Sequence, residues 1–82
     1  MRIMLIRECI NGRSFQLNTD LPFLPYKGLM IQPREYGVCV TVSDRLKYVC
    51  EKDALLVFTE GRATASEVSC LMAEGGWVRQ ED

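Results

Sequence analysis

The sequence predicts a mainly β protein of the α+β class, with a strongly bent five-stranded antiparallel sheet and one short C-terminal helix. Apolar and polar residues alternate without interruption from Tyr36 to Glu51, which is the period of a half-buried strand. The pair Asn11-Gly12 stands between two strand-like stretches and is a strong signal for a β-hairpin. Near the C-terminus, Thr64-Ala65-Ser66-Glu67 matches the capping box that begins many helices.

The predicted strands are joined by short connections, so the sheet is expected either to bend strongly or to close into a small barrel. Such a barrel would be of the SH3-like or OB-like kind. An open sandwich of one sheet and one helix is the alternative. Residues 1–82 are expected to form a single domain, because a chain of this length supports one hydrophobic core.

The first predicted strand, Arg2 to Cys9, has apolar residues on both parities, which is typical of a central strand covered on both faces. Asn11-Gly12 tolerates positive φ at both centres of a type I′ turn and leads into a second strand, Arg13 to Asn18. Two prolines in Leu21-Pro22-Phe23-Leu24-Pro25 then favour an extended connection, whose Leu and Phe side chains are expected to fill the core. A short third strand is expected from Leu29 to Gln32.

The alternating segment from Tyr36 to Glu51 would be roughly 50 Å long as a single straight strand. A domain of about 100 residues has a radius of gyration near 13 Å, so this strand must bend or break. Asp44 is the one charge on its apolar parity. We therefore expect a bulge or tight turn at Asp44 that exposes the carboxylate, followed by a fifth, central strand from Ala54 to Glu60.

The predicted helix begins at Thr64 and ends at Gly75-Gly76, a natural C-terminal stop. Its apolar stripe consists of Val68, Leu71 and Met72. Trp77 and Val78 are expected to fold back onto the core, and Arg79 to Asp82 to form a frayed tail.

Charge and hydropathy argue against several classes of protein. Ten basic and eleven acidic residues leave a net charge of −1, which gives no long-range attraction to nucleic acid or to an anionic membrane. No segment reaches the ~18 consecutive apolar residues of a membrane span. Arg7 and Glu8 interrupt the apolar run at the start too early for a signal peptide, so a cytoplasmic location is expected.

The chain contains no histidine, which excludes Ser-His-Asp and Cys-His mechanisms. Its four cysteines lie 30, 11 and 20 positions apart, whereas structural zinc sites usually pair cysteines a few residues apart. We expect reduced thiols, no metal, no cofactor and no catalytic residue. The cysteines are Cys9, Cys39, Cys50 and Cys70.

These observations favour a non-catalytic binding module that forms a homodimer through an exposed sheet edge or an aromatic patch. Two alternatives stay open: a nucleic-acid-binding small β-barrel, and a small enzyme that uses carboxylate or cysteine chemistry. A groove that combines Tyr26, Arg34, Tyr36 and Trp77 would suit a peptide or a small ligand. The candidate ligand or interface residues are Tyr26, Arg34, Tyr36, Asp44, Tyr48 and Trp77.

The segment Leu21-Pro22-Phe23-Leu24-Pro25-Tyr26-Lys27-Gly28, followed by the alternating run from Tyr36, resembles the opening of short hypothetical bacterial proteins. Some of these are encoded by integron cassettes and other mobile elements. The resemblance covers about half of the chain and implies a compact, β-rich bacterial protein. Its motif is structural, so it carries over no functional residue.

Overall fold

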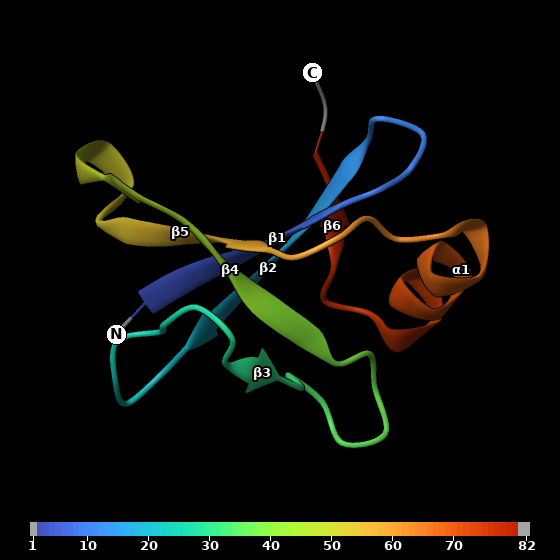
Figure 1. The fold of residues 1–82 in the computed structure, drawn as a ribbon, viewed down its shortest axis with the longest axis horizontal. Helices are drawn as coiled ribbons and strands as arrows, with labels where there is room; N and C mark the ends of the chain where they lie inside the picture. The colour runs from blue at the N-terminus through green and yellow to red at the C-terminus, as the bar shows by residue number, and fades with distance from the viewer. Residues whose placement is uncertain (1, 81–82) are drawn as a thin grey trace.

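The computed structural model describes residues 2–80 and consists of one curled, six-stranded sheet with a single α-helix beside it (Figure 1). The strand order is β3-β4-β5-β1-β2-β6, so β3 and β6 form the two edges of a half-barrel. A mainly β fold with one short helix is thus confirmed, but the sheet has six strands rather than five. The elements are β1 (Arg2–Glu8), β2 (Ser14–Asp20), β3 (Met30–Ile31), β4 (Val40–Val49), η1 (Cys50–Lys52), β5 (Ala54–Thr59), α1 (Ala65–Glu74) and β6 (Val78–Arg79).

The two central strands, β1 and β5, run parallel to each other, so the prediction of a purely antiparallel sheet is wrong. Both strands were predicted to be central because their sequences are continuous apolar runs, and this is confirmed. Such a run does not indicate the direction of the strand. The sixth strand, β6, ends at Arg79, the first residue of the predicted tail. Val78 and Arg79 pair with Gln16 and Phe15 of β2, and residues 81–82 of that tail lie outside the described part of the chain.

The β1–β2 hairpin is confirmed, but its turn is not of type I′. Gly12 alone has positive φ, at 84°, and its N–H donates to the Cys9 carbonyl at 3.1 Å. The Asn11 side-chain oxygen accepts from the backbone N–H of Arg13 at 3.0 Å. Asn11 therefore stabilises the turn through its side chain, and only the glycine adopts a left-handed conformation.

The long alternating segment forms a strand only over Val40–Val49, so the prediction of a strand starting at Tyr36 is wrong. Tyr36 lies in a turn with a φ of 65°, closed by a hydrogen bond from Gly37 N–H to the Arg34 carbonyl. The predicted bend at Asp44 is confirmed, because the pairing of β4 with β5 shifts register between Val42 and Leu46. Asp44 is exposed there.

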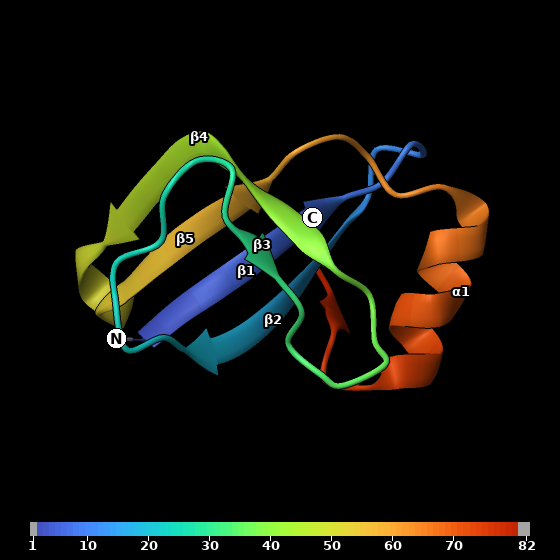
Figure 2. The ribbon, with the colours of Figure 1, turned by 60° about the horizontal axis from the view of Figure 1, so that its bottom comes forward.

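The main core lies on the concave face of the sheet. Ile3 and Leu5 of β1, Val57 of β5 and Leu71 of α1 are fully buried in it, and Trp77 joins them at 7% exposure. A smaller cluster of Met4, Ile6 and Ala54 occupies the opposite face. Helix α1 lies at one end of the half-barrel, whereas the connection from β2 to β3 and the β4–β5 hairpin lie toward the other end (Figure 2).

The helix follows its predicted bounds, with Thr64 as N-cap accepting a hydrogen bond from the Glu67 N–H. Leu71 is its one fully buried residue and Val68 packs against the core. Met72 is 68% exposed, so its predicted place in the apolar stripe is wrong. Val78 is likewise exposed, because it continues the sheet as an edge strand instead of folding inward.

A buried arginine joins the sheet to the helix. Arg7 points from β1 to the concave side, and its guanidinium donates to both carboxylate oxygens of Glu67, at 2.6 and 3.0 Å. It also donates to the Thr59 hydroxyl at 3.3 Å and to the Glu60 carbonyl at 2.5 Å. The Thr59 hydroxyl in turn donates to the Ile6 carbonyl at 3.0 Å. Charge-assisted, two-point pairing of this kind is the strong form of a protein hydrogen bond.

Replacing Glu67 should therefore destabilise the fold. Glu67→Gln leaves the buried guanidinium without its charge partner, and removing one partner of a buried pair costs about 3 kcal/mol. The matched control is Glu8→Gln, which removes the exposed Glu8–Arg45 pair and should cost less than about 1 kcal/mol. Urea unfolding measures the free energy of unfolding of both variants. Equal losses would contradict a central structural role for the Arg7–Glu67 pair.

Candidate interaction surface

The connection between β2 and β3 presents apolar side chains to solvent. The predicted filling of the core by this segment is wrong for Phe23 and Leu24, which are 47% and 61% exposed, and Tyr26 is 58% exposed. Leu21 and Leu29, near its two ends, are partly buried against the core. The connection is therefore anchored to the core at both ends, while the large side chains of its middle residues are exposed to solvent.

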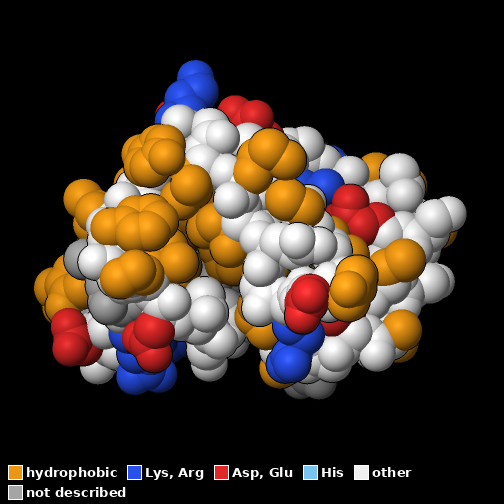
Figure 3. Space-filling view, turned by 90° about the horizontal axis from the view of Figure 1, so that it is seen from below, with side chains coloured by type: hydrophobic (Ala, Val, Ile, Leu, Met, Phe, Trp, Pro, Cys, Tyr) orange, Lys and Arg blue, Asp and Glu red, His pale blue; other side chains and the backbone are white. Residues whose placement is uncertain are grey.

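The second half of β4 continues this apolar surface. Leu46 and Tyr48 pair with Val57 and Leu55 of β5, whose side chains face the main core. Leu46 and Tyr48 are nevertheless 42% and 55% exposed. Hydrophobic side chains gather on the left of Figure 3, the side on which Figure 1 shows the β4–β5 hairpin. We call this surface the end patch; it consists of Phe23, Leu24, Tyr26, Leu46 and Tyr48.

A hollow of about 520 Å³ opens within the end patch. Leu24, Tyr48 and Leu55 contribute to its lining, with Arg2 and Asp53 as its charged members. Hollows that combine an apolar lining with a few polar groups are typical of ligand and peptide sites. The hollow is therefore the part of the end patch that is suited to receive an apolar side chain.

Tyr48 is held in place by its own hairpin. Its hydroxyl donates to the Asp53 carboxylate, and Asp53 has a left-handed φ of 47° at the turn into β5. This hydrogen bond raises the pKa of Tyr48 above its ordinary value, with smaller contributions from desolvation and from the negative charge of Asp53. The bond orients the ring beside the hollow.

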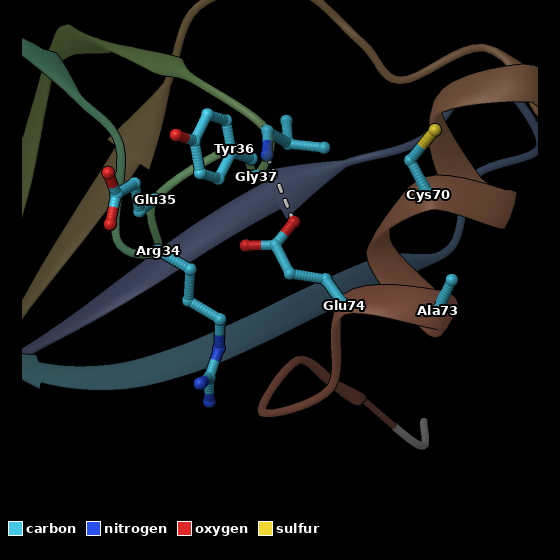
Figure 4. Close-up of a pocket in the computed structure, with 8 residues that line it drawn as sticks. Arg34, Glu35, Tyr36, Gly37, Cys70, Ala73 and Glu74 are labelled. Atoms are coloured by element: carbon cyan, nitrogen blue, oxygen red, sulfur yellow. Dashed lines mark hydrogen bonds between the residues drawn. The ribbon is translucent and has the colours of Figure 1, made fainter.

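A second hollow of about 520 Å³ lies between the 34–37 turn and α1 (Figure 4). One carboxylate oxygen of Glu74 accepts from the Val38 N–H at 3.0 Å, and its other oxygen is buried without a partner among residues 2–80. A Cβ at Gly37 would lie 2.5 Å from that second oxygen, so a larger residue at this position would displace the Glu74 carboxylate. Glu74 thereby ties the turn to the helix.

The six candidate residues fall into separate places. Tyr26 and Tyr48 belong to the end patch, whereas Arg34 and Tyr36 line the second hollow beside α1. Trp77 is buried in the core and so does not join them in one groove. Asp44 is exposed at the register shift of β4. The predicted combination of Tyr26, Arg34, Tyr36 and Trp77 does not form around either hollow.

Cysteine chemistry is divided between one buried thiol and three exposed ones. Cys9 is buried, and desolvation raises its pKa, partly offset by the nearby charge of Arg7. A raised pKa makes a thiol a poorer nucleophile at neutral pH. Among residues 2–80, no group of three or more cysteines and carboxylates is placed to hold a metal ion. The exposed thiols are Cys39, Cys50 and Cys70.

Within residues 2–80, the single α-helix is too short to cross a membrane. No family model, curated protein or solved structure is significantly similar to this chain. The resemblance to short bacterial proteins of mobile elements therefore stays a prediction. The site has to be judged from its own residues.

Removing the carboxylate that binds Tyr48 should lower the pKa of this tyrosine. Asp53→Gly retains a residue suited to positive φ and deletes the acceptor. Tyr48 should then titrate closer to the ordinary phenol value of about 10, as measured by tyrosinate absorbance against a Tyr48→Phe reference.

The same bond links stability to pH. Because the folded-state pKa of Tyr48 is raised, its contribution is present below the unfolded-state pKa and is lost as the pH rises through the folded-state value. Asp53→Gly should reduce this alkaline loss of stability, because it removes the largest cause of the raised pKa. An unchanged Tyr48 titration in the variant would show that the Asp53 bond is absent in solution.

Proposed function

We propose that this chain is a non-catalytic interaction module whose contact surface is the end patch. The observation that carries the proposal is the exposure of five large apolar side chains in the end patch, two of which, Leu24 and Tyr48, line a hollow. An apolar patch of this kind on a small protein is typical of an interaction site. Two of its members are tyrosines, a residue type enriched at the centres of interfaces.

The structure of the patch suits binding without large rearrangement. Hydrogen bonds from Gly28 N–H to the Val42 carbonyl and from Val42 N–H to the Leu29 carbonyl hold the end of the connection on β4, at 2.9 and 2.8 Å. Pro22 and Pro25 restrict its backbone further. A surface held in this way loses less conformational entropy on binding than a free loop would.

The homodimer expected from the sequence stays a prediction, and the end patch and the sheet edge next to it are the two surfaces that it would use. Location in the cytoplasm and a bacterial, mobile-element origin likewise stay predictions. The absence of histidine supports a module without catalytic chemistry, because it removes the commonest general base.

A charge placed in the end patch should abolish partner binding. Leu24→Glu introduces a carboxylate beside the hollow, and the loss of a central apolar contact costs about 2 kcal/mol or more, which is at least about tenfold in affinity. The matched control is Ile10→Glu, because Ile10 is also 61% exposed but lies in the β1–β2 turn.

Two measurements read out this pair of variants: sedimentation velocity for a second copy, and quantitative affinity capture from a lysate of the source cells for other proteins. The wild type and Ile10→Glu should retain the same partners, and Leu24→Glu should lose them. Equal behaviour of both variants, with circular dichroism showing that both are folded, would overturn the end patch as the contact surface.

A further inference from the structure

The outer edge of β4 is open next to the end patch. Its neighbour β3 pairs only with Val40 and Thr41, and the connection before β3 reaches no farther than Val42. Beyond the register shift, residues 46–49 pair with β5 on one side and with no other strand in the described part of the chain. Alternate backbone N–H and C=O groups of such a strand point away from its partner and can accept a further strand.

Side chains along this open edge alternate by chemistry. Leu46 and Tyr48 lie on the face of the end patch, and Lys47 lies on the opposite face, with Arg45 preceding it. The guanidinium of Arg45 lies 4.4 Å from the centroid of the Phe58 ring and donates to Glu8 at 2.7 Å. Lys47 is exposed and has no ion pair among residues 2–80. The edge is thus apolar on one face and presents the unpaired cation of Lys47 on the other.

This alternation disfavours a second copy as the added strand. When two copies of β4 pair antiparallel about a twofold axis, side chains that lie opposite each other must be on the same face of the sheet. Each possible register therefore has one central residue, which lies opposite the same residue of the second copy. Centring on Arg45 or Lys47 places identical cations opposite each other, and centring on Leu46 places Arg45 opposite the second Lys47. Like charges directly opposite destabilise a sheet pair. Centring on Tyr48 avoids this repulsion but leaves only the last residues of the strand to pair.

We propose that the outer edge of β4 binds an extended segment of a partner protein in which acidic and apolar side chains alternate. The segment adds a strand to the sheet, with a carboxylate opposite Lys47 and its apolar side chains over Leu46 and Tyr48. One apolar side chain enters the hollow beside Leu24. Main-chain hydrogen bonds supply affinity in this mode of recognition, and the side chains on the two faces supply specificity. The inference rests on the proposed function and names its partner class.

The test uses two labelled synthetic peptides, one alternating valine with glutamate and one alternating valine with lysine. Fluorescence anisotropy at low salt should show that the wild-type protein binds the glutamate peptide about threefold more tightly, because the cross-strand pair at Lys47 changes from attraction to repulsion. Lys47→Glu should reduce or reverse this preference. The control Lys52→Glu makes the same change of charge at an exposed lysine outside β4 and should retain it.

Several outcomes would overturn the inference. Equal binding of both peptides would show that the edge does not select acidic segments, while the end patch could still be an interaction surface. Binding of neither peptide, while Leu24→Glu still abolishes partner capture, would place the contact on the end patch alone. A preference for glutamate that survives Lys47→Glu would show that it does not arise at this edge. A wild-type dimer whose backbone amides at 46–49 are all protected would identify a second copy as the occupant.

Discussion

The rest of the structure depends on the pairing of Arg7 with Glu67. An arginine that points from a central strand into the concave core is costly to bury unless its donors are satisfied, and here one carboxylate, one hydroxyl and one carbonyl accept from it. The carboxylate belongs to the first turn of α1, so the pair sets where the helix lies on the sheet. Leu71 and Val68 then cover the core at that end of the half-barrel. One ionic contact thus organises the packing of the only α-helix in residues 2–80.

The position of the helix leaves the other end of the sheet to be covered by a connection alone. Leu21 and Leu29 reach the core there, but the residues between them cannot fill the remaining space, since both neighbouring prolines restrict the chain. Phe23, Leu24 and Tyr26 stay outside as a result. The register shift before Leu46 separates the second half of β4 from β3, which leaves its outer edge without a strand. The end patch and the open edge are therefore two consequences of the same arrangement.

Local patterns in the sequence predicted most elements, because each depends on neighbouring residues. The hairpin at Gly12, the bend at Asp44 and the helix from Thr64 are of this kind. Contacts between distant residues could not be predicted in the same way. The parallel pairing of β1 with β5 has no local signal, and the capping-box pattern could not show that the Glu67 side chain binds Arg7. For the site, Tyr26 and Tyr48 were among the candidate ligand or interface residues and lie exposed in the end patch, whereas Leu24 and Leu46 were missed because apolar residues in strand-like runs are normally buried.

The proposed recognition of a partner segment requires that the outer edge of β4 be unpaired in the free protein. Hydrogen–deuterium exchange, measured residue by residue by NMR on the dilute protein, tests it most directly. The account predicts that slow and fast amides alternate from 46 to 49, while the Val42 amide, which donates to the Leu29 carbonyl, exchanges slowly. Slow exchange at every residue from 46 to 49 in the monomer would contradict the account, because it would mean that the edge of β4 is already paired.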